Sequence, residues 1–317
     1  MHEGNFTSHD GAELFYRAWP ARSGNARGAI VLLHRGHEHG GRVAHIAEEL
    51  GLDDFAFYAW DARGHGRSPG ERGHSPSFAH SVRDLDCFIR HIGETGGFAT
   101  DRIAVVAQSV GAVLAATWVH DYAPGIRALV LASPAFDVKL YVPFARQGIA
   151  LWQKLKGRFF VNSYVKARFL THDPERIASF EADPLITRPI ASNILLELYE
   201  SADRVVADAR AITVPTQILI SGSDFVVRHT PQHRSSKISA ALSRNAIFCP
   251  VSITTPWAKR IAPRRWTRSG ASSPRASTNR PWRRICGRRI FPAIRATRPT
   301  GLRHRLRLFL RAGSTGR

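Results

Sequence analysis

The sequence predicts an α/β fold whose mostly parallel sheet is covered by helices on both faces. Residues 14–18 alternate as a first strand does, and after them short, continuous apolar runs, bounded by turn residues and too short for helices, recur along the chain. Such runs are typical of strands that are buried on both faces of a parallel sheet. The segments between them are long enough to return as helices. The expected strands are residues 14–18, 29–34, 55–60, 103–107, 128–132 and 217–220.

Two crossover helices are the clearest, at residues 77–91 and 110–120, because their apolar residues recur every three or four positions. Ser77 is expected to cap the first of them, since its hydroxyl can accept a hydrogen bond from a free N–H of the first turn. About eighty residues separate the strand that ends near Pro134 from the one near Gln217. That is more than an ordinary crossover uses, and it predicts a helical lid insertion at about residues 136–210.

Within the lid, Leu140, Phe144, Leu151 and Leu155 are spaced at 4, 7 and 4 positions, with basic residues between them. This spacing predicts an amphipathic helix. Its apolar face either seats the lid on the core, as most such stripes do, or makes transient contact with a lipid surface.

The charge distribution divides the chain in two. All 25 acidic residues lie at or before Asp224, whereas residues 233–317 hold 21 of the 45 Lys and Arg. The formal charge of +20 is therefore a property of the last quarter of the chain, where regular periodicity also stops. We expect a folded domain at 8–232 that stops before its last strand and helix, followed by an irregular, disordered Arg-rich tail at 233–317. Such a tail binds nucleic acid only non-specifically, through counterion release.

The cysteines and the N-terminus narrow the class of protein and its expected location. Three cysteines without a CxxC pair give neither a disulfide framework nor a zinc signature. The N-terminus has no apolar signal region, and no run approaches the roughly 18 apolar residues of a membrane span. We therefore expect a soluble, cytoplasmic protein that needs no cofactor and no metal.

The strand at 103–107 leads through Ala107-Gln-Ser109-Val-Gly111 directly into a helix. This is the context of a nucleophile elbow, in which small flanking residues let the strand and the helix approach while the serine occupies a strained turn. Ser109 is therefore the candidate nucleophile. Taken alone, A-x-S-x-G departs from the usual G-x-S-x-G, and an ordinary helix-capping serine is the alternative.

The Gly-rich segment at 34–42 follows an earlier strand and can point a backbone N–H at a developing oxyanion. We expect the N–H groups of Gly36 and Val110 to form this oxyanion hole. The three histidines of the segment, His34, His37 and His39, lie in a turn without a distant partner, so a metal site is not predicted.

Two further segments place an Asp in a turn that follows a predicted strand. The segment at 61–68 lacks the phosphate-binding patterns, and we interpret Asp61, His65 and Ser68 as residues that hydrogen-bond the loop. Asp224 ends a late strand, where α/β sheets place functional groups, and it is the candidate triad acid. An Asx turn is its alternative interpretation.

Four segments together, 34–42, 61–72, 107–111 and 221–227, resemble the monoacylglycerol lipase and lysophospholipase branch of the α/β hydrolases, a serine aminopeptidase-like group. The similarity spans about residues 8–232. It implies an α/β-hydrolase fold, a small-molecule acyl ester as substrate, a serine nucleophile and an Asp that orients a His. Ala-Gln-Ser-Val-Gly and His-Arg-Gly-His-Glu-His are most similar to the hydrolase half of bacterial bifunctional α/β hydrolase and SAM-dependent methyltransferase proteins. No methyltransferase sequence is visible.

No triad His is identifiable. In that branch it lies on a Gly-x-x-His loop after the acid, which is missing here. His229 and His233 follow Asp224 too closely to swing back, and His304 lies in unpatterned sequence.

We hypothesise that the chain left its reading frame near Arg234. Shifting the codons of residues 248–257 allows the decoding Leu-Pro-Gly-Phe-Tyr-His-Asp-Thr-Leu, which restores Gly-x-x-His. The predicted function is a serine hydrolase of carboxylic esters. The alternatives are a crippled, frame-shifted hydrolase fragment and a nucleic-acid binder that acts through its basic tail.

Overall fold

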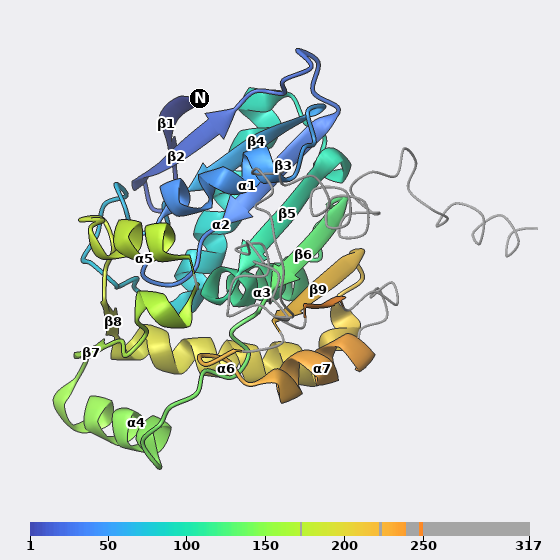
Figure 1. Ribbon diagram of the computed structural model, residues 1–317. Helices are drawn as coiled ribbons and strands as arrows, with labels where there is room; N and C mark the ends of the chain where they lie inside the picture. The colour runs from blue at the N-terminus through green and yellow to red at the C-terminus, as the bar shows by residue number, and fades with distance from the viewer. Residues whose placement is uncertain (172, 222–223, 239–246, 250–317) are drawn as a thin grey trace, which may run out of the picture.

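The computed structural model describes residues 1–171, 173–221, 224–238 and 247–249. Its centre is an eight-stranded sheet in the order β1-β2-β4-β3-β5-β6-β9-β10 (Figure 1). β1 and β2 are antiparallel to their neighbours, and the remaining strands pair in parallel. The strands are β1 (His2–Thr7), β2 (Glu13–Trp19), β3 (Gly28–Leu33), β4 (Phe55–Trp60), β5 (Ile103–Gln108), β6 (Ala128–Ala132), β9 (Thr216–Ser221) and β10 (Ile247–Cys249).

Helices cover both faces of this sheet, because successive strand side chains point to opposite sides. In β3, Val31 and Leu33 pack in one cluster with α2 (Phe78–Gly96) and α3 (Val110–Tyr122). Ile30 and Leu32 pack in a second cluster with the short helices η1 (Gly40–Val43) and α1 (Ala44–Glu49). The predicted fold class is therefore confirmed. Ser77 caps α2 as expected, since its Oγ accepts a hydrogen bond from His80 N.

The long insertion between β6 and β9 forms the predicted lid. Its elements are α4 (Ala145–Lys156), β7 (Phe160–Asn162), η3 (Ala167–Phe169), α5 (Pro174–Glu181), β8 (Pro189–Ala191) and α6 (Ser192–Ala207). α6 packs on the core through Leu198, Ala202 and Val205, whereas no residue of α4 is buried. Figure 1 shows α4 at the periphery, away from the sheet. No helix among the described residues is both long enough and apolar enough to cross a membrane.

Regular structure extends past both predicted domain boundaries. β1 precedes residue 8, and its pairing with β2 makes it part of the sheet. At the other end, α7 (His229–Ile238) runs across residue 232, and β10 adds a parallel strand beside β9. The prediction that periodicity ends near residue 234 missed these two elements. Residues 239–246 and 250–317, where most of the expected disordered tail falls, lie outside the described residues. The short helices η2 (Thr100–Arg102) and η4 (Ala209–Ala211) complete the described part.

Candidate active site

Ser109 lies alone between the end of β5 and the start of α3, in a sharply bent conformation. Its φ of 54° and ψ of −114° are strained for a residue with a side chain, at a cost of about 1–3 kcal/mol. The backbone around it enforces this bend, because Ser109 N donates to Ala132 O at 2.9 Å and Ser109 O accepts from Ala135 N at 3.1 Å. Strain that is maintained in this way is typical of functional positions.

Glycines bring the neighbouring backbone close to the bend. A Cβ on Gly111 would lie 2.4 Å from the carbonyl oxygen of His34, so that only glycine fits there without a shift. A Cβ on Gly36 would lie 3.0 Å from Val110 Cγ2. The loop after β3 therefore lies directly against the start of α3, which brings both expected oxyanion donors, Gly36 and Val110, beside Ser109.

These three residues line one apolar cavity of about 100 Å³. Ser109 is 8% exposed. Ser109 is therefore largely covered by its neighbours. Most of the wall comes from lid and α6 side chains, among them Leu140, Tyr164, Leu170, Phe180, Leu195 and Leu198. Such a wall suits an acyl chain, because apolar surface favours apolar ligands.

Asp224 follows β9, two strands away from Ser109 in the sheet order. Its Oδ1 accepts hydrogen bonds from Val226 N and Val227 N, both at 2.8 Å, which is the Asx-turn arrangement. Its Oδ2 is buried and has no hydrogen-bond partner among the described residues. Burial raises the pKa of Asp224, opposed by the two backbone hydrogen bonds. Val226 also lines the cavity of Ser109, so the acid turn and the serine adjoin the same space.

No histidine of the described residues completes a triad. His229 begins α7, and its Nε2 is buried without a described partner. No hydrogen bond joins His229 Nε2 to Asp224 Oδ2. His304 lies outside the described residues.

Sequence reasoning missed Lys139, which approaches the same turn and donates from Nζ to the carbonyl oxygen of Asp224. The backbone N–H of Lys139 also donates to Val226 O, so the start of the lid is tied to the acid turn. No sequence motif marks this lysine.

The histidines after β3 have structural partners. His34 Nε2 accepts from Ala62 N at 3.0 Å while Nδ1 lies 2.7 Å from Arg35 O, and burial lowers the pKa of His34. His39 caps η1 through Nδ1, and its Nε2 lies 2.9 Å from Asp183 of the lid. These contacts fix the loop that carries Gly36.

The loop after β4 is held together as the sequence suggests. Asp61 accepts hydrogen bonds from Gly40 N at 2.7 Å and from Arg67 N at 2.8 Å, and Ser68 Oγ donates to Asp61 O. His65 Nδ1 lies 2.9 Å from Arg63 O, and burial lowers the pKa of His65 to about 3. These residues shape the loop.

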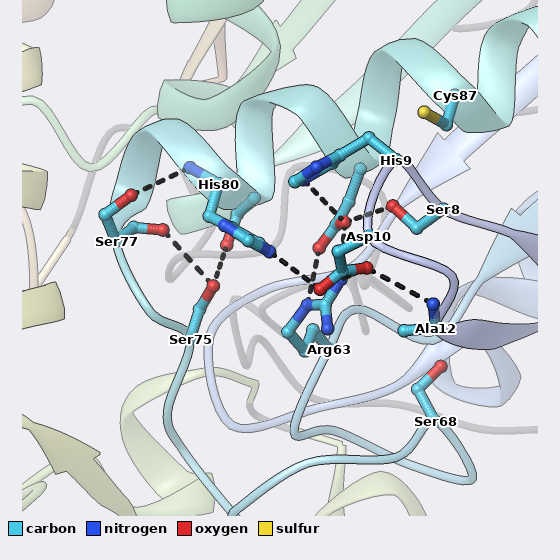
Figure 2. A network of polar contacts seen from close by, with 12 residues as sticks. Ser8, His9, Asp10, Ala12, Arg63, Ser68, Ser75, Ser77, His80 and Cys87 are labelled. Carbon is cyan, nitrogen blue, oxygen red and sulfur yellow. Dashed lines mark hydrogen bonds and ion pairs between the residues drawn. The ribbon is translucent and has the colours of Figure 1, made fainter.

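Figure 2 shows where this loop meets the N-terminal hairpin and α2. Arg63 donates to Asp10 and to the fully buried Asp84, and His80 Nε2 lies 3.0 Å from Asp10 Oδ2. His9, Asp10 and His80 form the one group of metal-ligand side chains within the described residues. Burial opposes ionisation of Asp10, but hydrogen bonds from Arg63 and His80 lower its pKa. Arg63 already supplies the positive charge that this carboxylate needs, so the cluster serves to join the hairpin to α2.

Comparisons with known proteins show the family of the chain and its fold. The profile of the family described as serine aminopeptidase, S33 matches residues 24–247. The chain is 62% identical over 227 residues to the YnbC protein of Escherichia coli (strain K12), a match that covers 72% of this chain and 39% of that protein. It is 28% identical over 235 residues to the monoacylglycerol lipase of Mycolicibacterium smegmatis, covering 71% of this chain and 80% of that enzyme.

Solved structures give the same fold. A monoacylglycerol lipase from Paleococcus ferrophilus has a TM-score of 0.66 at 22% identity, covering 74% of this chain and 88% of that one. A soluble variant of the Saccharomyces cerevisiae monoglyceride lipase has a TM-score of 0.67 at 16% identity, covering 77% and 84%.

The sheet, the lid and the serine at the bend between β5 and α3 define an α/β hydrolase. Because the profile spans well over half of its length, the chain belongs to the serine aminopeptidase, S33 family. It is by descent an enzyme of the α/β-hydrolase fold.

Proposed function

We propose that this fold serves to hydrolyse carboxylic esters of the acylglycerol or lysophospholipid kind, with Ser109 as the nucleophile. The observation that carries the proposal is the strained bend at Ser109, which lines an apolar cavity. Gly36 and Gly111 allow the backbone to come close to this bend. The names of relatives support the proposal, since several are monoglyceride lipases.

The chemistry follows from the positions of these groups. A base removes the proton from Ser109 Oγ, which attacks the acyl carbonyl carbon to give a tetrahedral oxyanion. The N–H groups of Gly36 and Val110 stabilise that oxyanion, and its collapse expels the alcohol and leaves an acyl-serine. Water activated by the same base then releases the acid and restores Ser109.

The base is the missing part of this scheme. A triad acid needs an imidazole N–H to accept, and Asp224 Oδ2 is a buried acceptor without a described partner. We infer that an imidazole occupies this position in an intact relative, and that the frame change near Arg234 removed it here. In the serine protease subtilisin, loss of a triad member costs about 10⁶ in kcat and leaves roughly 10³ over water. The chain as written is then a crippled hydrolase.

The Arg-rich tail leads to a proposal about the reading frame and about the domains of the parent protein. We propose that residues 233–317 are largely read in a shifted frame, and that the parent protein is a bifunctional hydrolase and methyltransferase. The match to the E. coli relative leaves 61% of that protein outside the alignment, which is room for a second module. Sequencing the gene past codon 234 in related strains tests both ideas; an uninterrupted frame that encodes the same tail contradicts the first.

We also propose that α4 touches lipid surfaces. Leu151, Trp152 and Leu155 are 60%, 53% and 66% exposed, and Lys154 and Lys156 lie between and beyond them. Of the predicted stripe, Phe144, Leu151 and Leu155 are thus largely exposed, whereas Leu140 lines the cavity of Ser109. Exposed apolar side chains flanked by basic ones favour an anionic membrane surface.

A fluorophosphonate probe tests the nucleophile. We expect slow labelling that maps to Ser109, disappears in Ser109→Ala, and persists in Ser23→Ala, because Ser23 is an exposed loop serine remote from the bend. Labelling that survives Ser109→Ala contradicts the proposal.

Added imidazole tests the missing base. If the carboxylate of Asp224 marks the position of an absent side chain, free imidazole should raise the turnover of a short-chain ester in a saturable manner. Ser109→Ala and Asp224→Ala should each abolish this rescue. The same increase in both variants would mean that imidazole acts in solution and not at the site.

A further inference from the structure

A second cavity, of about 250 Å³, adjoins the cavity of Ser109. Arg35, Leu170 and Phe180 line both spaces, and Gln108, which lines the second, directly precedes the serine. The volume exceeds that of several water molecules, each of about 30 Å³. The two cavities therefore share part of their walls, and the second adjoins the residue before Ser109.

Three guanidinium groups line the second cavity. Arg35, Arg42 and Arg176 line it, and no carboxylate among the described residues does. We call it the arginine-lined cavity. Its arginines come from the loop after β3, from η1 and from the lid helix α5, so the core and the lid each contribute charge.

Neighbouring side chains hold two of these guanidinium groups in place. Arg35 forms a paired contact with Glu38, with Nε donating to Oε2 at 3.0 Å. Arg42 donates from Nη1 to Ser179 Oγ at 2.8 Å, and the same Nη1 lies 3.7 Å from Asp183 Oδ2. Neither Nε nor Nη2 of Arg42 is hydrogen-bonded to another described residue. Since a guanidinium has five N–H donors, Arg42 keeps several for a ligand.

The third guanidinium is positioned by a histidine. Arg176 donates from Nη1 to His45 Nε2 at 3.0 Å and from Nη2 to Glu49 at 2.9 Å. Burial, followed by the charge of Arg176, lowers the pKa of His45 to about 4. His45 is therefore neutral near pH 7 and acts as an acceptor. Each of the three arginines also has a carboxylate partner, at 3.7 Å in the case of Arg42, and Asp173 Oδ2 lies 3.7 Å from Arg176 Nε.

We propose that the arginine-lined cavity binds the phosphate of a monoacyl glycerophosphate whose acyl chain occupies the apolar cavity. Guanidinium groups match the geometry of phosphate oxygens and form charge-assisted hydrogen bonds with them. A neutral glycerol head would leave the remaining donors of Arg42 without an anionic acceptor. This inference rests on the proposed function, because it assumes that the ester carbonyl lies at Ser109.

Binding to the full-length Ser109→Ala chain tests the inference without interference from turnover. Calorimetry compares hexanoyl glycerol 3-phosphate with hexanoyl glycerol below their micelle concentrations. We expect the phosphate ester to bind at least about tenfold more tightly, with a preference that shrinks as salt is raised. Equal affinity for the two ligands would overturn the proposal.

Arginine variants in the same background locate the anion. Arg42→Gln and Arg176→Gln should each weaken binding of the phosphate ester about fivefold or more and leave the neutral ester unchanged. Arg42→Lys keeps the charge but loses the paired donors. Its affinity for the phosphate ester should lie between those of the Ser109→Ala parent and Arg42→Gln. Arg90→Gln, an exposed arginine of α2, is the control. Melting temperatures confirm folding, and a preference that survives both glutamine variants contradicts the assignment.

Inorganic phosphate and glycerol 3-phosphate separate a lipid head group from a free anion. The proposal is supported if both anions bind weakly and each competes with the phosphate ester for the same site. If either binds as tightly as the acylated ligand, the acyl chain adds nothing and the substrate assignment is wrong. Because binding is measured without Ser109 Oγ, failure here leaves the labelling test of the proposed function unaffected.

Discussion

The substitution Gly111→Ala measures how closely the start of α3 approaches the loop after β3. The added Cβ would lie 2.4 Å from the carbonyl oxygen of His34 and 3.2 Å from Leu33 Cβ, whereas such contacts are essentially never shorter than 3.0 Å. The helix or the loop must therefore move by about 0.6 Å. The contacted atom is backbone, so it cannot rotate away.

Overpacking of this kind costs about 1–3 kcal/mol. For a domain of this size each kcal/mol lowers the melting temperature by about 2–4 °C, so we expect a loss of roughly 2–12 °C in thermal unfolding. Gly125→Ala is the control, because a Cβ there meets no atom within 4 Å. Its free energy of unfolding should stay within about 0.5 kcal/mol of that of the starting chain. If the two variants melt alike, the close approach at the bend is not as described.

Three further outcomes are expected. Asp224→Asn removes a buried charge, so it should melt at the same temperature as the parent chain or higher at pH 7. Because burial raises the pKa of Asp224, the folded state binds its proton more tightly, and stability of the parent should fall as pH rises from 3.8 through the raised pKa. A variant that keeps this pH slope, or that loses several degrees, contradicts the argument. Leu151→Ser with Leu155→Ser should weaken sedimentation with anionic vesicles several-fold without changing the melting temperature, whereas unchanged sedimentation would point to other surfaces. Deleting residues 250–317, which follow β10, should abolish most of the retention on nucleic acid at low salt, and retention that survives unchanged would place the binding surface in the folded domain.

Six of the eight strands of the central sheet, all but β1 and β10, could be predicted from local pattern. β4 and β6 coincide with the predicted residues 55–60 and 128–132, because each is a continuous apolar run between turn residues. β1 could not be predicted in this way, because His2–Thr7 buries only Phe6 and the strand exists through its pairing with β2. Its stabilisation is tertiary, and no periodicity in the segment reveals it.

The apolar spacing predicts a lid helix that begins near Leu140, but α4 begins at Ala145. Pro143 disfavours helical backbone in the residue before it, and Phe144 adopts a left-handed φ of 55°. The preceding segment pairs with the acid turn instead, through Val138 and Val227. The period of four between Leu140 and Phe144 therefore does not mark a helical turn.

Residues within one short motif are easier to predict than those that converge from distant segments. Ser109 and Val110 belong to one strand-to-helix turn, so their proximity follows from five consecutive residues. Arg42 and Arg176 meet only because the lid folds back over η1, and isolated arginines carry no spacing signal. The unpartnered oxygen of Asp224 is likewise a property of packing, which the sequence could not reveal.

In this interpretation, Ser109 is a correctly positioned nucleophile, but the chain no longer encodes the histidine that would act as its base. Fluorophosphonate labelling tests both claims, that Ser109 is the nucleophile and that its base is missing. Intact mass gives the rate of labelling, and peptide mapping gives the labelled residue. The rate is compared between this chain and a version in which the frame beyond residue 234 is restored. We predict modification of Ser109 in both, at least about 10³-fold faster in the restored protein. Equal rates, or modification at another residue, would contradict this interpretation.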